Sequence, residues 1–274
     1  MAIGVELIHK ASVIRDDVED DDSRRSGQAS LHAAYGMAVA LAASDLLWTT
    51  GLAHISQGHP PHQRAQYVGA AATTLREMAA GQMEDLSPSF DAHSPTARLA
   101  VDEQKTGALS ELACRLGAMA AEAPPQHIEA LATYGRKLGT AFQIVNTIRN
   151  LEGVEPERLP ASDLKKRRDT VLTAHVREKE GLDIRVAPTS QRRAGLDLDD
   201  ATVDQLRAEF LSFGAATFGE RIANQLLSAA RMQLRVLPAT SARNILEQLA
   251  GESLFHVYAF GDQIPRLANS SLTG

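Results

Sequence analysis

The sequence predicts an all-α protein folded as one large helical bundle. Alanine and leucine are abundant and β-branched residues are sparse, which favours helix over strand. Apolar residues recur at helical spacing in two clear stretches, 203–213 and 222–237. Proline, glycine and serine interrupt such stretches at 59–61, 87–89, 123–125, 153–160 and 187–195. We therefore predict eight to ten helices in a single domain spanning residues 1–274, with the polar segment 177–200 as a mobile loop.

The composition restricts the function. Of 274 residues, 44% are hydrophobic and 23% are charged, so the chain can bury a core. The net charge of −6 argues against nucleic-acid binding, which needs a basic face. Cys114 is the only cysteine and the N-terminus does not have the pattern of a signal peptide, which together favour the cytoplasm. The longest apolar run is interrupted by Ser44 and Asp45, so no transmembrane segment is expected.

The first candidate site is the acidic run Asp16–Asp22, which has six carboxylates in seven positions and is followed by Ser23 and two arginines. On a helix, Asp16 and Asp20 are one turn apart and share a face. Such a DDxxD pattern directs carboxylates toward one point, and Mg²⁺ is often held by one or two carboxylates together with a substrate phosphate. Spacing alone leaves two alternatives open, a metal site or an exposed acidic helix end.

Four further stretches accompany this run, and together they resemble motifs of the trans-isoprenyl diphosphate synthases (polyprenyl synthetases). They are GQMEDL at 81–86, KTGAL at 105–109, GTAFQIVNTIRNLEG at 139–153 and DLKKRRDT at 163–170. The five motifs occur in the family's order and extend over most of the chain. The resemblance implies the all-α isoprenoid synthase fold, Mg²⁺ as cofactor and an allylic prenyl diphosphate as substrate.

The resemblance also assigns roles to residues. Asp16, Asp17 and Asp20 would bind Mg²⁺ that bridges to the allylic diphosphate, which makes them catalytic together with Lys105. Arg25, Lys105, Gln143 and Arg168 would contact that diphosphate. His9 would lie beside an acceptor diphosphate, and Gln82 and Asp85 would form a wall of the cavity. Ala11 and Ser12, five and four positions before Asp16, would set chain length, and because both are small they allow a chain of twenty carbons or more.

The chain departs from the family pattern at three places. The second aspartate-rich motif is replaced by Asn146-Thr147-Ile148-Arg149-Asn150, in which only Asn146 and Asn150 remain as candidate metal ligands. The family's second arginine after the first motif, which binds isopentenyl diphosphate, corresponds to Ser26. The family's earlier helices, with their GGKRxRP-type loop, have no counterpart in this sequence. Losing three charge-assisted contacts, each worth roughly 1.5–3 kcal/mol, would remove useful binding of that acceptor.

Three functions therefore compete. The first is a Mg²⁺-dependent prenyltransferase that ionises an allylic diphosphate and passes the cation to an acceptor, which need not be isopentenyl diphosphate. The second is a terpene synthase on the same scaffold, which needs no acceptor. The third is a non-catalytic partner subunit of a complete synthase, which the altered second motif favours and the intact first motif opposes. The resemblance also implies a homodimer.

Overall fold

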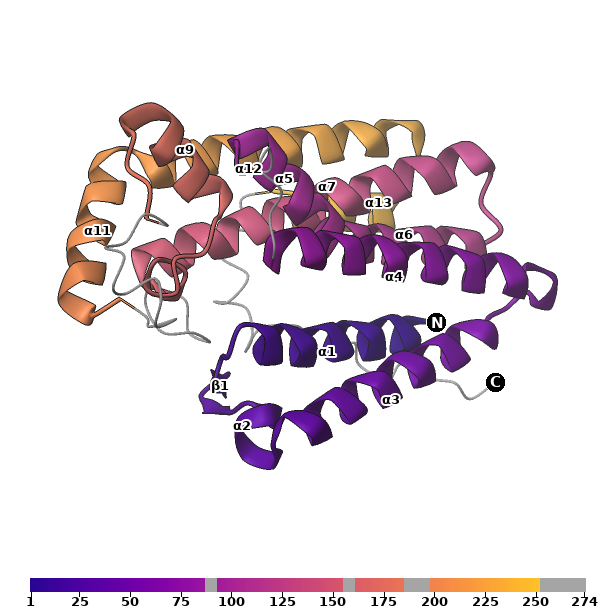
Figure 1. The fold of residues 1–274 in the computed structure, drawn as a ribbon. Coiled ribbons are helices and arrows are strands. Elements are labelled where there is room, and N and C mark those ends of the chain that lie inside the picture. Colours follow the sequence, from indigo (N-terminus) through magenta and orange to yellow (C-terminus); the bar gives the residue numbers. More distant parts are fainter. Residues whose placement is uncertain (87–92, 155–160, 185–197, 252–274) are drawn as a thin grey trace.

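The computed structural model describes residues 1–86, 93–154, 161–184 and 198–251, and these are almost entirely helical (Figure 1). In chain order the elements are α1 (Ala2–Glu19), β1 (Arg24–Arg25), β2 (Gln28–Ala29), α2 (Leu31–Tyr35), α3 (Met37–Ser56), η1 (Pro61–Gln63), α4 (Arg64–Leu86), α5 (Pro95–Asp102), η2 (Glu103–Gly107), α6 (Ala108–Ala120), α7 (Pro125–Glu152), α8 (Ser162–Lys165), α9 (Val171–Glu180), α11 (Asp200–Ser212), α12 (Ala215–Gln233), η3 (Leu234–Val236) and α13 (Ser241–Leu249). The all-α prediction is confirmed.

The helix predictions hold where the apolar pattern is long. The stretch 203–213 lies in α11 except for its last residue. Residues 222–236 lie in α12 and η3, and residue 237 directly follows η3. The described residues contain more helices than the eight to ten predicted, because one-turn helices such as α2 and α8 are too short to show a period. The prediction of a loop at 177–200 is wrong at its start, since α9 continues to Glu180, and Leu198 is buried; residues 185–197 lie outside the described part.

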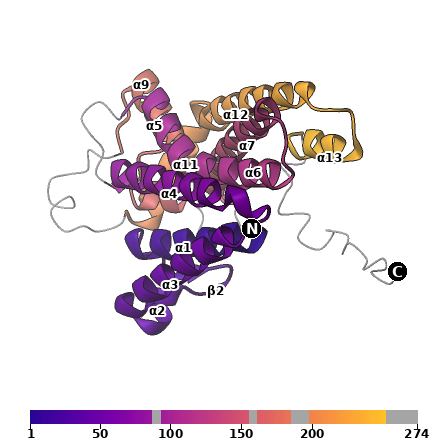
Figure 2. The same ribbon diagram turned by 90° about the vertical axis from the view of Figure 1, so that its right-hand side faces the viewer.

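The long helix α7 is the centre of the larger hydrophobic core. Pro125 occupies its first turn, where a missing N–H costs nothing, and Gly153 ends it in the left-handed conformation at φ 72°. Along its length α7 packs against α6 on one side and α12 on the other, as both ribbon views show (Figures 1 and 2). It therefore carries residues 146–150 on a rigid support.

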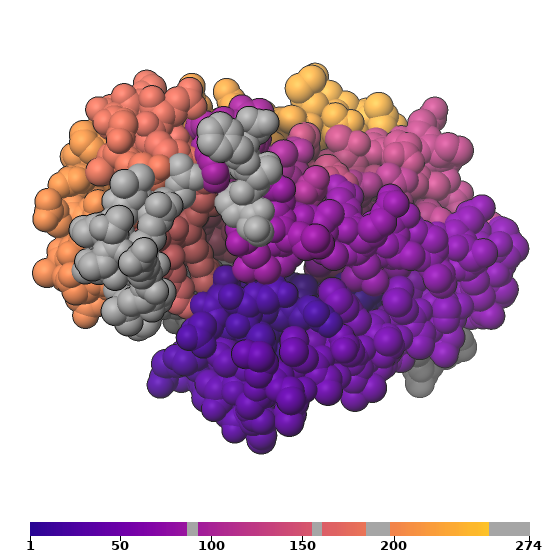
Figure 3. All heavy atoms as spheres, in the orientation of Figure 1, coloured from indigo at the N-terminus to yellow at the C-terminus, as the bar shows by residue number. Residues whose placement is uncertain are grey.

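A second, smaller core joins α1 and α3 to α4 and α6. Glycines allow α1 and α3 to touch: a Cβ on Gly4 would come within 2.7 Å of the carbonyl oxygen of Gly51. Ile8 of α1 packs with Leu112 and Leu116 of α6, which closes the molecule at the N-terminal end of α1. Toward the other end of α1, the space-filling view shows a hollow between the α1–α3 pair and α4 (Figure 3). The acidic run begins in the last turn of α1.

Helix α3 has an outer face that the described residues leave uncovered. Val39 and Leu46 are 52% and 66% exposed, and Tyr35 and Met37 just before them are also exposed. By length and composition α3 is also the one helix among the described residues that passes a test for a membrane span. This contrasts with the expectation from Ser44 and Asp45. The apolar window of α3 is 22% buried, and a single helix of this kind is weak evidence for a membrane span.

Candidate active site

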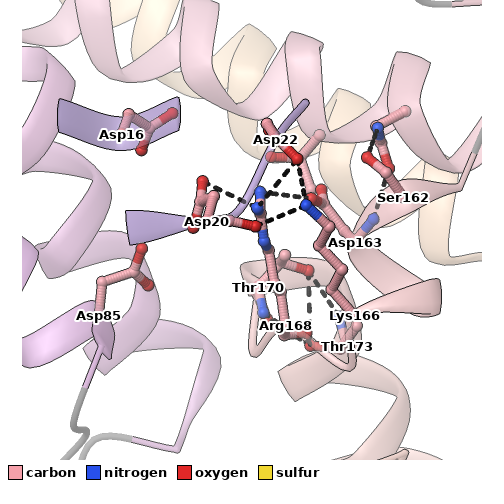
Figure 4. Close-up of polar contacts among 12 residues, drawn as sticks. Asp16, Asp20, Asp22, Asp85, Ser162, Asp163, Lys166, Arg168, Thr170 and Thr173 are labelled. Carbon is pink, nitrogen blue, oxygen red and sulfur yellow. Dashed lines mark hydrogen bonds and ion pairs between the residues drawn. The ribbon is translucent and has the colours of Figure 1, made fainter. Parts of the chain in front are cut away.

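The acidic run divides into two sides where α1 ends. Asp16 and Asp20 lie one turn apart, with side chains 27% and 14% exposed. Their carboxylates lie on the side of the site where Asp85 also points inward from α4 (Figure 4). Asp17 is rotated about 100° from Asp16 and is turned away from them. It is 4% exposed and accepts hydrogen bonds from Arg25, with a distance of 3.0 Å from Nε to Oδ1.

This pairing separates Asp17 from the expected metal ligands. Burial raises the pKa of the Asp17 carboxyl, and the hydrogen bonds from Arg25 offset that effect only in part. Arg25 itself sits on β1 of the small hairpin, and its Nη2 lies 3.7 Å from the nearest oxygen of Asp16. The geometry therefore gives Asp17 the task of holding Arg25 at the edge of the site.

Lys105 reaches the site from a π-helical turn, Glu103–Gly107, inserted between α5 and α6. Such a turn is a frequent feature of functional sites because it displaces side chains from the regular helix face. Its ammonium contacts the carboxylate of Asp85 and lies 3.8 Å from Asp16. Burial alone would lower the pKa of Lys105, but these carboxylates raise it overall, so Lys105 stays protonated.

Asp85 was predicted to form part of the cavity wall, and the structure also shows it paired with two cations. One oxygen contacts Lys105 and the other contacts Arg98, whose side chain is 3% exposed. Burial would raise the pKa of Asp85, and the two cations together bring it below its ordinary value. The sequence did not predict a role for Arg98, because a lone arginine between apolar residues of α5 belongs to no recognisable motif.

Three other predicted residues have defined contacts. The side-chain amide oxygen Oε1 of Gln143 on α7 accepts a hydrogen bond of 3.1 Å from Thr106 in the π-helical turn. Gln82 donates to Glu19 at 2.6 Å and so ties α4 to α1. His9 is 46% exposed, two turns before Asp16, and its ring nitrogen lies 3.4 Å from Glu6. Nothing in these contacts tests the substrate role predicted for them.

The two predicted chain-length residues do not lie together. Ala11 is fully buried, and its carbonyl oxygen accepts a hydrogen bond of 2.9 Å from Ser44 on α3. Ala11 is five residues before Asp16 and so lies about 140° from it around the helix axis. Ala11 therefore faces α3 and not the side of Asp16. Ser12, four residues before, shares the face of Asp16 and donates to the carbonyl of His9 at 2.8 Å. The chain-length role of both residues stays a prediction.

The altered second motif has its own structural use. Asn150 is 2% exposed, and both ends of its amide are engaged: Nδ2 donates to Ser162 at 2.8 Å, and Oδ1 accepts from the Asp163 N–H at 3.1 Å. Its metal role is therefore not supported. Asn146 differs, because its Oδ1 is buried without a hydrogen-bond partner among the described residues. Glu155 and Glu157, two other acidic residues near this motif, lie outside that part of the chain.

The segment after α8 joins the two motifs. Arg168, predicted to bind substrate, lies 2.8 Å from Asp20 and 3.3 Å from Asp163 (Figure 4). Lys166 donates to the carbonyl oxygen of Asp20 at 2.6 Å and contacts the carboxylate of Asp22. Neither Lys166 nor Asp22 was predicted, although a run of four cations in a chain with a run of six anions was a signal of charge pairing.

The residues fit a hard divalent cation on one side only. Asp16 and Asp20 offer two carboxylates one turn apart, which suits Mg²⁺ because it keeps several waters and shares its site with phosphates. The described residues contain no ready group of three or more acidic, histidine or cysteine side chains for a metal. Around residues 146–150 the donors are neutral, and the one amide oxygen not in use is that of Asn146.

The fold is an all-α bundle, and its site brings the carboxylates of Asp16 and Asp85 to a partly buried lysine. The sequence profile described as Polyprenyl synthetase matches residues 1–192. The chain belongs to the polyprenyl synthetase family, and the prediction from its motifs is confirmed.

The chain aligns with named relatives over most of their length. The chain is 29% identical to a geranylfarnesyl diphosphate synthase of Natronomonas pharaonis over 258 residues, covering 91% of this chain and 72% of the relative. It is 28% identical to heptaprenyl diphosphate synthase component 2 of Geobacillus stearothermophilus, covering 91% and 76%. Among solved structures, a geranylgeranyl pyrophosphate synthetase from Pyrococcus horikoshii superposes with a TM-score of 0.79 at 27% identity, covering 93% of this chain and 78% of that one. The relatives are thus prenyl diphosphate synthases of different product lengths.

Proposed function

We propose that this chain is a Mg²⁺-dependent prenyltransferase that ionises an allylic prenyl diphosphate and transfers the prenyl group to an acceptor. The observation that carries the proposal is the position of Lys105, whose charged ammonium lies between Asp85 and Asp16 at the end of α1. A fixed cation beside a carboxylate pair is the arrangement that a leaving diphosphate requires.

The residues act on the leaving group. When the bond between the allylic carbon and the diphosphate oxygen breaks, its electron pair goes to the diphosphate. Mg²⁺ held by Asp16 and Asp20 would act as a Lewis acid on those oxygens. Lys105 and Arg25 donate hydrogen bonds to the developing charge, and because Asp85 and Asp17 hold them in place, little reorganisation is needed. The allylic cation is then attacked by the π electrons of the acceptor, and a proton is lost.

A terpene synthase is the second candidate, and Ser26 favours it. Ser26 stands where the family has an arginine for the acceptor diphosphate, and here it forms the hairpin turn at φ 50° beside Arg25. A hydroxyl there cannot replace a guanidinium as a phosphate ligand. In a synthase of this kind the cation would react with its own double bonds, and no acceptor would be bound.

One assay separates these functions. The full chain is incubated with Mg²⁺ and geranyl, farnesyl or geranylgeranyl diphosphate, with and without isopentenyl diphosphate, and pyrophosphate and prenyl products are measured. A lengthened diphosphate supports elongation, and a hydrocarbon or alcohol formed without acceptor supports the terpene synthase. Absence of pyrophosphate release in every condition would sink both and favour the partner subunit, a role suggested by the relative named component 2.

Removing either central charge should abolish most activity. We expect Asp16→Ala and Lys105→Ala each to lower pyrophosphate release at least about 100-fold, the typical effect of losing one group that stabilises developing charge. Asp45→Ala is the matched control for Asp16, since Asp45 pairs with Arg15 on the far side of α1. Lys165→Ala is the matched control for Lys105→Ala, since Lys165 pairs with Asp200 of α11. Unchanged turnover in Asp16→Ala or Lys105→Ala would refute the site assignment.

We also propose a cytoplasmic homodimer without nucleic-acid partners. The family resemblance supports the dimer, and the single cysteine and net negative charge support the rest.

A further inference from the structure

The second-motif side of the site offers too little for a divalent cation. Residues 146, 147 and 150 are neutral, and the amide of Asn150 is used at both ends by Ser162 and Asp163. Within residues 146–150 what remains is the amide oxygen of Asn146, which is buried and without a partner among the described residues. The nearby carboxylates have other partners: Asp163 pairs with Arg168 at 3.3 Å, and Glu152 at the end of α7 lies near Arg207 and Glu220. Hard cations need several oxygen ligands with carboxylates among them, so this donor set does not fit one.

Two protein cations reach across from this same side. The hydrogen bonds of Asn150 attach the α8 segment to α7, and the chain then continues to Lys166 and Arg168. The Lys166 ammonium lies 2.6 Å from the carbonyl oxygen of Asp20, and the Arg168 guanidinium lies 2.8 Å from its carboxylate. Figure 4 shows both side chains extending from the α8 segment toward the end of α1. The space between the two motifs is therefore bridged by two positive side chains.

The charges on the two walls are consistent with this arrangement. A divalent ion held between two acidic walls brings two positive charges, and Lys166 with Arg168 brings the same number. Like charges a few ångströms apart repel strongly in a partly buried site. A metal ion between these two side chains and α7, where the motif residues are neutral, would therefore be disfavoured, whereas on the first-motif side the carboxylate of Asp20 lies next to Arg168 and offsets its charge.

We propose that Lys166 and Arg168 take the place of a metal ion on the second-motif side, so that metal binds the diphosphate through the first motif alone. The inference rests on the proposed function, since it names the groups that neutralise the same diphosphate. On binding, diphosphate oxygens accept hydrogen bonds from the Lys166 ammonium, which exchanges its contact with Asp22 for the phosphate. Lys166 is thereby a substrate-binding residue that the motif pattern does not include.

The first test counts metal ions. Mn²⁺ bound to the full chain is measured by electron paramagnetic resonance at saturating inorganic pyrophosphate. We expect Asp16→Asn to lower the number of bound Mn²⁺ ions and Asn146→Leu, which removes the amide oxygen but keeps the branched shape of the side chain, to leave it at the wild-type value. A Mn²⁺ ion lost in Asn146→Leu would overturn the inference.

The second test measures the affinity for inorganic pyrophosphate by calorimetry in the presence of a chelator. We expect Lys166→Gln to weaken this metal-free binding about tenfold, as for the loss of one charge-assisted hydrogen bond. Lys165→Gln is the matched control, because Lys165 is the residue next to Lys166 and its ammonium pairs with Asp200 at 2.7 Å. The affinity of Lys165→Gln for pyrophosphate should stay within about twofold of wild type. Equal affinities in wild type and Lys166→Gln, or no metal-free binding by wild type, would contradict the proposal.

A third variant distinguishes binding from support of the fold. If Lys166 served only to anchor its segment to Asp22, then Asp22→Asn would weaken pyrophosphate binding as much as Lys166→Gln does, and this result would also contradict the proposal. We expect Asp22→Asn to bind at least as tightly as wild type, because it removes a competing anion. These tests use no prenyl chain, so a protein that passes them and yet releases no pyrophosphate from allylic diphosphates would refute the proposed prenyl transfer alone.

Discussion

At the scale of single residues, the site depends on carboxylates that hold cations in place. Asp85 fixes Lys105, and Arg98 supports Asp85 from behind. Arg98 is almost fully buried, and its Nε and Nη1 have no partner among the described residues. A buried arginine in that state is expensive, so we interpret it as a structural contribution to the position of Lys105.

Asp102, near this group, makes stability depend on pH. Burial raises its pKa to about 7, and the charge of Asp85 adds to the effect. Since the folded pKa lies above the unfolded value of about 3.9, the stabilisation from the protonated form is complete below about pH 4 and is lost as pH rises to about 7.

We therefore expect Asp102→Asn, which resembles the protonated form, to be more stable than wild type above pH 7 and to lose this advantage toward pH 4. Urea midpoints from pH 4 to pH 8 measure the difference. The exposed Asp204→Asn should show no such trend, and an Asp102→Asn advantage that is independent of pH would contradict the assignment.

At the scale of elements, close packing of α4 against the π-helical turn places Lys105. A Cβ on Gly81 would come within 2.7 Å of the Cβ of Gln104 and 3.2 Å of the backbone nitrogen of Lys105. The missing side chain at residue 81 thus lets α4 bring Asp85 against Lys105. Gly117 in α6 is an exposed helix glycine with no atom near the position of an added Cβ.

We expect Gly81→Ala to lower pyrophosphate release about 100-fold, because a displacement near 1 Å is enough to misalign a catalytic group. Gly117→Ala makes the same chemical change without a clash. It should leave activity unchanged and raise the unfolding free energy by about 1 kcal/mol, the usual gain of alanine over glycine in a helix. Initial rates and urea unfolding of both variants provide the comparison, and full activity in Gly81→Ala would show that the contact does not matter.

At the scale of the whole molecule, the α1–α3 pair forms one wall of the hollow seen in Figure 3 and leaves the outer face of α3 uncovered. The exposed apolar residues of α3 form a surface that association would bury. We expect the proposed homodimer to use this face.

Leu46→Glu should therefore raise the dimer dissociation constant at least about tenfold, since a buried unpaired carboxylate is costly. Sedimentation equilibrium over a range of concentrations measures it. Met232→Glu changes a similarly exposed residue on α12 and should leave association as in wild type. A wild-type chain that stays monomeric, or a Leu46→Glu variant that still forms dimers, would exclude this surface.

How far the sequence predicted the site can be seen from its residues. Asp16 and Asp20 share a face because they lie a helical turn apart, and that spacing is visible in the sequence. Lys105 and Asp85 lie on other elements, and they were predicted from the family resemblance, not from spacing. The partners Arg98 and Lys166 were missed, because no local pattern shows which residue of α5 or of the α8 segment will meet a carboxylate far away in the chain. The burial of Ala11 could not be predicted for a similar reason, since it depends on the packing of α3.

The sequence by itself determined the helical class, the family and the residues that carry charge at the first motif, because these depend on local periodicity and on residue identity. Only the tertiary structure decided that Asp17 holds Arg25, that Asn150 is used in a loop contact, and that Lys166 reaches Asp22. These pairings depend on how α1, α7 and α8 pack. DDVEDDD therefore predicts a binding site, and the fold pairs its carboxylates with arginine and lysine, while Asp16 and Asp20 are the proposed metal ligands.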